Sequence, residues 1–542
     1  MAFCKNNSQQ MSIENSLYGM TEREKNKLKN SWAEFFSSEI FPNICEERFS
    51  ILYSANHASR PNNPVNVYLG LLLIRDMFNQ SDEEAIDSLL FDLRYQHALH
   101  TSSMVEQPIS KNSLSNFRAQ VLKNYEETGK DLIQEEVEAL APILMKIAGI
   151  DGRTKRMDSM MVASSCRSLS RLELLYSVVS RMVKAIQRVD GKKLPESMER
   201  YLLEGHRNTT IYHSRNTDIK SKYAVLLEDA HQLKKALSET SLISLQEYQL
   251  LLRFLSEQSE YKEEVLCLKD PKTLSSETLQ NPTDPDASYR KKGNKSYKGY
   301  VANLVESVGN NTGIVEHYDF QKNTYSDQKF CLDVINKLGE QVNPTDLIVD
   351  GAFYTTQNEK AANTNNIELL PTNLTGRKPA VEKETICDFV IDPQTTLLIQ
   401  CPAGHAPMTS KYNDKDGIIH ACFNKKHCEQ CERYDKCPII RQKKKNVFRV
   451  SKHQYQLAHM KVRMGTEEYR DRVTIRAGVE GVPSVLRRKH RVDEMPIRGL
   501  MCAKIWFGIK VGASNLRRTY KMWKDELKNL LQPRFLLISC PQ

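Results

Sequence analysis

The sequence lacks any run of 18 apolar residues, which is about the length that a membrane-spanning helix needs. The first residues, Met-Ala-Phe-Cys-Lys-Asn-Asn, contain no apolar core of a signal peptide. These two absences favour a soluble cytoplasmic protein. At 542 residues, the chain is long enough for two to four domains, each with its own hydrophobic core.

Support for a disulfide framework is also lacking. The thirteen cysteines are odd in number and belong to a long chain without a signal peptide. Internal repeats, long low-complexity segments and a Ser-His-Asp pattern for nucleophilic catalysis are absent as well. Five cysteines lie between residues 401 and 437, and this clustering needs an explanation of its own.

The net charge of +10 is unevenly distributed. Residues 439–542 contain 24 Lys or Arg against 8 Asp or Glu, so this part carries +16 and residues 1–438 carry −6. Such a basic region suits a polyphosphate partner, because each neutralised phosphate releases counterions. A solvated basic surface is the simpler alternative. An anionic membrane is less favoured, since no strong amphipathic anchor accompanies the charge.

The N-terminal part is predicted to be helical. Residues 1–20 are polar and are expected to form a flexible N-terminus. Within residues 21–150, Thr21, Ser81 and Ser110 each resemble the first residue of a capping box. Short helices with polar turns fit a DNA-binding domain of the helix-turn-helix type. They fit a plain helical bundle equally well, and the sequence alone does not decide between the two.

The middle of the chain is predicted to form a mixed α/β core of residues 151–165 and 281–394. Residues 166–280 are predicted to form a helical insertion within this core. Residues 395–440 form a cysteine-rich insertion, and residues 441–542 form a basic C-terminal part that is mainly helical from 452 to 530. The helical pattern of the large insertion extends to about residue 266. The core elements are predicted as strands 154–164, 296–307, 313–320, 347–349 and 367–370 and a helix 327–338.

The clustered cysteines predict a structural zinc site. Cys428 and Cys431 form a CxxC motif, Cys437 follows six residues later, and Cys401 precedes them in Cys-Pro-Ala-Gly-His. Four thiolates in a tetrahedral array close the coordination sphere, so such a zinc would be structural and not catalytic. Unligated reduced thiols are the alternative. One of four other residues could replace a ligand: Cys422, His405, His420 or His427.

Three acidic residues are candidates for a site that binds divalent cations. Asp158 lies in the first core strand, Asp350 ends the run Leu-Ile-Val-Asp, and Glu480 lies among arginines on a predicted helix. Ligands of open α/β sheets gather beyond the carboxyl ends of strands, where Asp350 is expected. Hard cations prefer oxygen ligands, and two of them can stabilise both the attacking and the leaving oxygen of phosphoryl transfer. Each acid taken singly could also be an ordinary surface carboxylate.

The surroundings of Glu480 leave two interpretations open. Arg476 and Glu480 are spaced i,i+4, so a continuous helix would present both on one face. Arg476 could then bind a DNA phosphate, or it could form an ordinary surface ion pair. Gly478 and Pro483 weaken the helix pattern and indicate a kink or a helix start near Glu480.

These motifs resemble the DDE transposases of bacterial insertion sequences, over about residues 30–510. The resemblance rests on Asn56–Phe117 and on five motifs in order: Arg156-Met-Asp-Ser, Thr283-Asp-Pro-Asp with Tyr297-Lys-Gly-Tyr, Ile348-Val-Asp-Gly-Ala-Phe-Tyr, the cysteines from 401 to 437, and Arg476-Ala-Gly-Val-Glu with its trailing basic residues. Val473 stands where the family has a tyrosine, and Met160 stands where a small polar residue is frequent, which puts full activity in question.

The resemblance implies a ribonuclease-H-like core in which Asp158, Asp350 and Glu480 bind two Mg²⁺ or Mn²⁺ ions and catalyse DNA cleavage and strand transfer. It also implies that the N-terminal domain recognises terminal inverted repeats, that a homodimer forms on double-stranded DNA, and that the protein associates with the nucleoid. The candidate phosphate contacts are Lys155, Arg156, Arg476, Lys489 and Arg491. The alternatives are a decayed or domesticated DNA-binding protein, and a nuclease of the same fold without strand transfer.

Overall fold

The computed structural model describes residues 1–6, 19–56, 58–101, 109–190, 194–212, 219–263, 265–309, 312–339, 345–374, 386–478 and 481–531. The chain divides into two compact units. The first comprises residues 1–152, 158–326 and 480–542, and the second comprises residues 153–157 and 327–479. The predicted mixed α/β class is confirmed, because both units combine helices with strands and the strands include antiparallel and parallel pairs.

The N-terminal helices begin where the sequence predicts. Thr21, Ser81 and Ser110 each complete a capping box, in which the side chain accepts a hydrogen bond from a backbone N–H three residues later. The prediction of a flexible N-terminus is wrong for Ala2, which is buried and bridges Ser54, whereas residues 7–18 lie outside the described residues. The helices are α1 (Glu22–Lys29), α2 (Trp32–Phe35), α3 (Val65–Phe78), α4 (Asp82–Phe91), α5 (Leu93–Ala98), α6 (Lys111–Thr128) and α7 (Leu132–Ile147).

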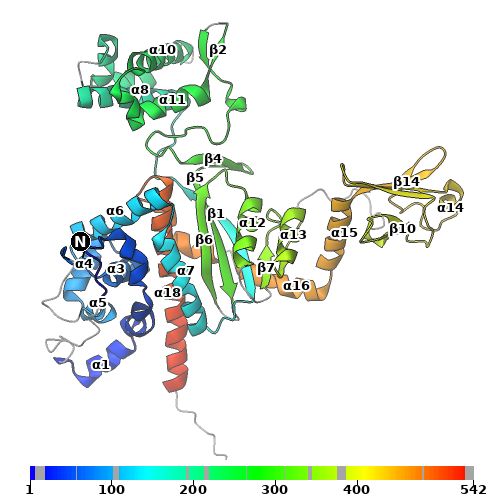
Figure 1. Cartoon of the computed structure of the whole chain (residues 1–542), viewed down its shortest axis with the longest axis horizontal. Helices are drawn as coiled ribbons and strands as arrows, with labels where there is room; N and C mark the ends of the chain where they lie inside the picture. Colours follow the sequence, from blue (N-terminus) through cyan, green and yellow to red (C-terminus); the bar gives the residue numbers. More distant parts are fainter. Residues whose placement is uncertain are drawn as a thin grey trace, which may run out of the picture. The chain divides into compact units, whose positions relative to one another are not determined.

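Helix α18 (Leu500–Leu531) joins the N-terminal helices to the sheet of the first unit. It packs against α3, α7 and β6 (Gly313–Lys322), and it runs beside α7 in Figure 1. Gly508 permits this close approach, since a Cβ at this position would lie 2.0 Å from the hydroxyl oxygen of Tyr318. Largely buried ion pairs fix the helix on two sides: Lys510 with Asp76 at 2.7 Å, and Arg518 with Glu306 at 2.7 Å.

The sheet of the first unit is built around β5 (Lys295–Val308). Its first residues pair with β4 (Ser288–Lys292), and residues 300–308 pair with β6, both in antiparallel fashion. The end of β1 (Thr154–Ala163) lies next to Gly299, where a Cβ would come within 2.3 Å of the carbonyl oxygen of Val162. Gly299 also has a φ of +148°, so both space and backbone conformation require glycine. The predicted strands 154–164, 296–307 and 313–320 are confirmed, but β4 was not predicted because it is rich in Lys and Arg.

The large insertion folds around its own hydrophobic core, made by α8 (Arg171–Asp190), α10 (Ile219–Leu237) and α11 (Gln246–Gln258), with the short α9 (His206–Ile211) beside them. Its amphipathic helices bury leucines, valines and Met182 toward one another. The prediction of helix to residue 266 is wrong at its end. Residues 259–268 instead form a hairpin of β2 (Ser259–Lys262) and β3 (Val265–Leu268), which is visible beside α11 in Figure 1.

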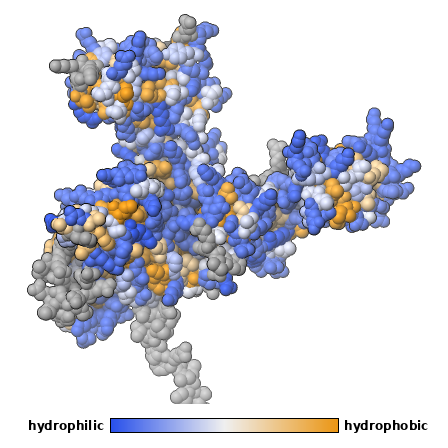
Figure 2. Space-filling model, viewed as in Figure 1, coloured by the Kyte–Doolittle hydropathy of each residue, from blue (hydrophilic) through white to orange (hydrophobic). Residues whose placement is uncertain are grey.

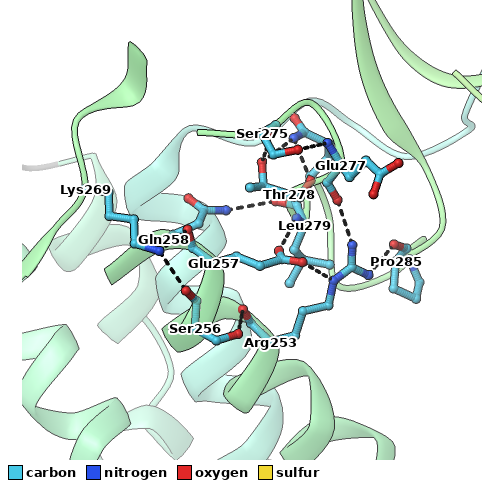
Figure 3. A network of polar contacts seen from close by, with 11 residues as sticks. Arg253, Ser256, Glu257, Gln258, Lys269, Ser275, Glu277, Thr278, Leu279 and Pro285 are labelled. Atoms are coloured by element: carbon cyan, nitrogen blue, oxygen red, sulfur yellow. Dashed lines mark hydrogen bonds and ion pairs between the residues drawn. The ribbon is translucent and has the colours of Figure 1, made fainter. Parts of the chain in front are cut away.

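Residues 269–287 connect the insertion back to the sheet, and we call them the return segment. Polar contacts attach the end of α11 to this segment (Figure 3). Arg253 donates from Nη1 to the carbonyl oxygen of Pro285 at 2.7 Å and from Nη2 to that of Glu277 at 2.9 Å. The carboxylate of Glu257 accepts from the backbone N–H of Leu279 at 2.7 Å. The return segment therefore has a fixed path although residues 281–286 contain no helix or strand.

The second unit contains two parallel strand pairs. Residues 154–156 of β1 pair with residues 346–348 of β7 (Thr345–Val349), and β7 pairs along its length with β8 (Ile367–Pro371). Helices α12 (Asp327–Leu338) and α13 (Thr356–Thr364) precede and follow β7. The predicted helix 327–338 and the strands near 347–349 and 367–370 are confirmed. Parallel strands require such crossovers, which explains the alternation of strands and helices in the sequence.

The cysteine-rich region forms a small β structure. Four strands, in the order β11-β12-β14-β13, pack around Phe389, Ile419 and Phe448, and the sheet extends beyond residue 440 to Ser451. The strands are β9 (Val390–Ile391), β10 (Leu398–Gln400), β11 (Thr409–Asn413), β12 (Ile418–Phe423), β13 (Ile440–Arg441) and β14 (Asn446–Ser451), with α14 (Lys425–Glu429). Helices α15 (Lys452–Met464) and α16 (Glu467–Thr474) follow, and α17 (Gly481–His490) belongs to the first unit.

Within the described ranges, none of the helices has both the length and the hydrophobicity that crossing a membrane requires. The face of the molecule in Figure 2 is mainly hydrophilic, with small hydrophobic patches between charged residues. Isolated apolar side chains of this kind are ordinary on protein surfaces.

His490 ends α17 and is completely buried in the first unit. Its Nδ1 lies 3.2 Å from the carbonyl oxygen of Asp76 and so acts as the donor, whereas Nε2 finds no hydrogen-bond partner among the described residues. Burial, together with the nearby Lys510 ammonium, lowers the pKa of His490 to about 4. The imidazole is therefore neutral at neutral pH.

We predict that His490 makes the folded chain sensitive to acid. Between pH 6.5 and 4 the unfolded chain binds a proton at this imidazole and the folded chain does not, so the free energy of unfolding falls as the pH falls. The loss should be on the order of 3 kcal/mol. Urea unfolding at pH 7 and pH 4.5 measures it, and His490→Gln should depend less steeply on pH. Equal pH dependence in both proteins would contradict the prediction.

Candidate active site

Asp350 lies directly after β7, at the carboxyl end of a parallel strand. Its carboxylate is half-buried, and Oδ1 accepts a hydrogen bond from the backbone N–H of Gly351 at 2.7 Å. The same N–H also donates to Oδ1 of Asn373 at 2.9 Å. A Cβ on residue 351 would lie 2.5 Å from the backbone oxygen of Asn373, so the close approach of these two loops requires glycine. The other carboxylate oxygen of Asp350 makes no hydrogen bond to a described residue.

Asp158 lies in the middle of β1 and is also half-buried. Its Oδ1 accepts a hydrogen bond from the backbone N–H of Ser159 at 2.9 Å. It follows the segment of β1 that pairs with β7, in which Arg156 is level with Ile348. Asp158 thus lies within a strand and Asp350 directly follows one, as the sequence predicts.

Glu480 lies outside the described residues; the described chain ends at Gly478 before it and resumes at Gly481 after it. The predicted continuous helix is wrong. Helix α16 ends at Thr474, a 3₁₀ turn spans Ile475–Gly478, and α17 starts at Gly481. The start of α17 at Gly481 agrees with the alternative prediction of a helix start near Glu480. The side chain of Arg476 is not described, so its predicted pairing with Glu480 is untested.

The segment that precedes Glu480 is attached to β7 and β8. Arg472 donates from Nη2 to Asp346 at 2.8 Å and also binds Glu368. The buried hydroxyl of Tyr469 donates to the carbonyl oxygen of Pro371 at 2.8 Å, and burial raises the pKa of Tyr469 to about 12. These contacts fix α16 at the edge of the parallel strands.

Two arginines connect β1 to the segments on either side of Glu480. In the second unit, Nη1 of Arg156 donates to the carbonyl oxygen of Ile475 at 2.6 Å. In the first unit, Nη2 of Arg487 donates to the carbonyl oxygen of Met161 at 2.7 Å. The sequence placed Arg487 in a basic run but gave no sign of this backbone contact, because the partner is more than 300 residues away.

The predicted phosphate contacts differ in their exposure. Lys155 and Arg156 are buried, with 2% and 7% of their surface exposed, and Arg156 fills the space beside Gly478. Buried cations that hold neighbouring segments are poorly placed to meet DNA, so these two predicted contacts are not retained. Lys489 and Arg491 are exposed, and Arg491 lies 4.0 Å from Glu494.

The four predicted zinc ligands line one pocket of the second unit, together with His405 and His427. Tight turns hold them, since Cys431 N–H donates to the carbonyl oxygen of Cys428 at 3.1 Å and His405 N–H donates to Sγ of Cys401 at 3.4 Å. The alternative ligands His420 and Cys422 lie on β12 and do not line this pocket. Nowhere in the described parts of the chain do three or more His, Cys, Asp or Glu side chains have the geometry of a metal site.

We predict that Gly351→Ala destabilises the second unit, because the new methyl group would collide with the backbone of Asn373. A steric conflict with backbone costs about 1–3 kcal/mol. Denaturant unfolding of the full chain measures the change. Gly481→Ala is the matched control, since a Cβ there meets no atom within 4 Å and should change stability by less than about 0.5 kcal/mol. Equal effects of the two variants would refute this account of Gly351.

Two family models match the chain. The transposase DDE domain matches residues 400–520, and a transposase domain, DUF772, matches residues 23–120. No curated protein and no solved structure gives a significant match. The first match includes the cysteine cluster and Glu480, and the second runs from α1 into α6. The resemblance to insertion-sequence DDE transposases is therefore confirmed.

Proposed function

We propose that this protein is a metal-dependent transposase of an insertion sequence, which cleaves DNA at the ends of the element and joins them to target DNA. Asp158, Asp350 and Glu480 would be its catalytic residues. The family matches favour metal-dependent DNA cleavage and transfer in general terms. The argument for these particular residues rests on strand register and on the contacts around Glu480.

The register of β1 and β7 is the observation that carries the proposal. Thr154 pairs with Asp346, and Arg156 pairs with Ile348. If this parallel register continued for two residues, Asp158 would be level with Asp350. Side chains at matching positions of adjacent parallel strands are neighbours, and the carboxyl ends of such strands are where ligands gather. Two carboxylates in this relation provide the oxygen ligands that Mg²⁺ or Mn²⁺ requires.

The contacts of β1 support Glu480 as the third acid. Arg156, two residues before Asp158, binds Ile475, and Met161, three residues after Asp158, accepts from Arg487. The chain thus touches β1 on both sides of Asp158 immediately before and after Glu480. Since β1 is bound at Ile475 before Glu480 and at Arg487 after it, we infer that Glu480 lies close to Asp158.

The proposed chemistry assigns separate tasks to the protein. Bound divalent cations would supply Lewis-acid stabilisation of the phosphorane charge and of the leaving oxygen. Asp158, Asp350 and Glu480 would hold these ions and, without them, would repel one another. The backbone N–H of Gly351 donates a hydrogen bond to Oδ1 of Asp350 and so orients the carboxylate. The other carboxylate oxygen is left for a ligand. A protein nucleophile is unnecessary, since water and then the freed 3′-hydroxyl attack phosphorus.

The strand order and crossovers of the second unit support a ribonuclease-H-like core, and we include this fold in the proposal. We further propose that the N-terminal helices recognise the inverted repeats and that a homodimer forms on two element ends. Among the predicted phosphate contacts, Arg476, Lys489 and Arg491 remain in the proposal. Lys489 and Arg491 follow Glu480 closely and are exposed, which suits contact with DNA near the scissile bond.

We predict that Asp350→Asn reduces both cleavage and strand transfer about a hundredfold to a thousandfold, because a lost metal ligand removes several kcal/mol of transition-state stabilisation. The assay uses duplexes that carry the inverted repeats flanking the gene, with Mg²⁺ or Mn²⁺. Asp471→Asn is the matched control, since Asp471 is an exposed acid on α16.

Undiminished joining by Asp350→Asn would exclude the catalytic assignment. Wild-type protein that binds the repeats but neither cuts nor joins them would indicate a decayed or domesticated DNA-binding protein. Cleavage without joining would indicate a nuclease of the same fold.

We also propose that Cys401, Cys428, Cys431 and Cys437 bind a structural Zn²⁺. The donor set fits this ion, since four thiols line one pocket and the turn after Cys401 directs the backbone N–H of His405 to its sulfur. Burial, with the adjacent Cys401 and Cys431, raises the pKa of the Cys428 thiol when metal is absent. Metal binding would remove this cost of deprotonation.

Metal analysis of the purified chain should give close to one zinc per chain, and Cys431→Ser should lose most of it. Cys422→Ser serves as the control, because Cys422 is buried on β12 away from the pocket and its substitution should leave the zinc content unchanged. A zinc content near zero in wild-type protein that is folded would refute the proposal.

A further inference from the structure

A basic hollow lies in the first unit where the end of β1, helix α8 and the return segment meet. Its cavity volume is about 360 Å³, and no Asp or Glu is among its lining residues. We call it the basic pocket. Its cationic lining residues are Arg167, Arg181, Lys184, Arg207 and Arg498, and its polar lining residues include Ser165, Ser177, Ser180, Asn281 and Thr283.

Hydrogen bonds fix the backbone segment that lines the basic pocket. Arg181 donates from Nη1 to the carbonyl oxygen of Pro282 at 2.9 Å and also binds the hydroxyl of Thr283. Asn281 donates from Nδ2 to the carbonyl oxygen of Arg167 at 2.9 Å. Further along the same segment, Arg253 donates to the carbonyl oxygen of Pro285 (Figure 3). A segment fixed at several points can present cations in a constant arrangement.

Three cations of the basic pocket have no hydrogen-bond or ion-pair partner in the described part of the chain. Lys184, Arg207 and Arg498 are exposed, and none of them forms a hydrogen bond or ion pair with the residues that the structure describes. Arg498 is nevertheless well positioned, because the next residue, Gly499, donates its N–H to the buried carboxylate of Asp284 at 3.1 Å.

A larger hollow of the same unit provides a contrast. It is lined by residues of α3, α6 and α18, and it also contains arginines. There, however, Arg75 and Arg118 both bind Asp82, and Lys510 binds Asp76 at 2.7 Å. Those charges are neutralised within the protein. The basic pocket, in contrast, combines several cations that have no ion-pair partner among the described residues with a lining that contains no carboxylate.

We propose that the basic pocket binds the phosphodiester backbone of the DNA substrate at a distance from the catalytic acids. This inference rests on the proposed function, which makes DNA the substrate. Exposed Lys and Arg side chains in a polar hollow match phosphate oxygens in charge and hydrogen-bonding capacity, and they contact the backbone without reading its sequence.

The position of the basic pocket indicates which phosphates it binds. Ser165 lines the pocket and lies seven residues after Asp158 along and just beyond β1. An extended chain rises about 3.3 Å per residue, so the two positions are at most roughly 23 Å apart. This distance corresponds to about seven base pairs of B-DNA. The pocket therefore contacts the same duplex whose end the catalytic acids hold.

The test compares DNA binding by the full chain and by Lys184→Gln/Arg498→Gln. Fluorescence anisotropy with a labelled duplex of about 30 base pairs of arbitrary sequence suffices, since backbone contacts do not depend on sequence. Loss of two phosphate contacts should weaken binding about tenfold or more at low salt. It should also reduce the slope of log K against log salt by about 2.

Lys220→Gln/Lys235→Gln is the matched control, because both lysines are exposed on α10 of the same insertion and the change in net charge is identical. Its affinity and salt slope should remain close to those of the wild type. Equal losses in the two double variants would mean that only net charge matters, and this would overturn the proposal. Unchanged binding by Lys184→Gln/Arg498→Gln would overturn it as well.

Failure of the proposed function and failure of the pocket proposal give different results. If Asp350→Asn still joins DNA, the catalytic assignment is wrong whatever the pocket variants do. If Asp350→Asn is inactive and the pocket variant binds like the wild type, only the pocket assignment is wrong.

Discussion

The arrangement of the proposed site depends on the hydrogen bonds that β1 makes with the chain around Glu480. The carbonyl groups at the end of a helix have no partner within the helix and must be satisfied from outside. Arg156 supplies a donor to Ile475 at the end of α16, and Gly478 leaves the space that its guanidinium needs. Arg487 of α17 donates a hydrogen bond to the carbonyl oxygen of Met161 in β1. These two contacts bind β1 to described residues on either side of Glu480.

A second constraint keeps the N-terminal helices and the sheet of the first unit together. Helix α18 approaches both closely because Gly508 and Gly512 carry no side chains, and its Lys510 and Arg518 reach buried carboxylates. Breaking such buried pairs leaves an uncompensated charge, so they hold the helix in one register. The start of α18 is fixed too, since Asp284 and Asp286 accept from its first N–H groups. Those aspartates belong to the return segment, which connects the insertion with the core.

The positive charge of the chain therefore has two different uses. Arg156, Arg472, Arg487, Lys510 and Arg518 bind carbonyl or carboxylate groups of the protein and stabilise its architecture. Lys184, Arg207 and Arg498 bind no such group and remain available to a polyanion. A count of charges in the sequence cannot separate these two groups. It assigned the excess to residues 439–542, whereas most lining residues of the basic pocket belong to the insertion and the return segment.

Local patterns in the sequence were sufficient for much of the fold. Capping boxes at Thr21, Ser81 and Ser110, the strand 154–163 and the helix 327–338 depend on residues close together in the chain, so the sequence determines them directly. The hairpin 259–268 and strand β4 were missed, because tertiary pairing there outweighs a helical or charged local pattern. The sequence also determined the acids and cysteines that bear the proposed chemistry. Gly478 and Pro483 also indicated a helix start near Glu480. Only the tertiary structure decided that Lys155 and Arg156 are buried and which arginines face solvent. Each of these outcomes depends on a partner hundreds of residues away, or on the space that a neighbouring segment leaves, and no local pattern records either.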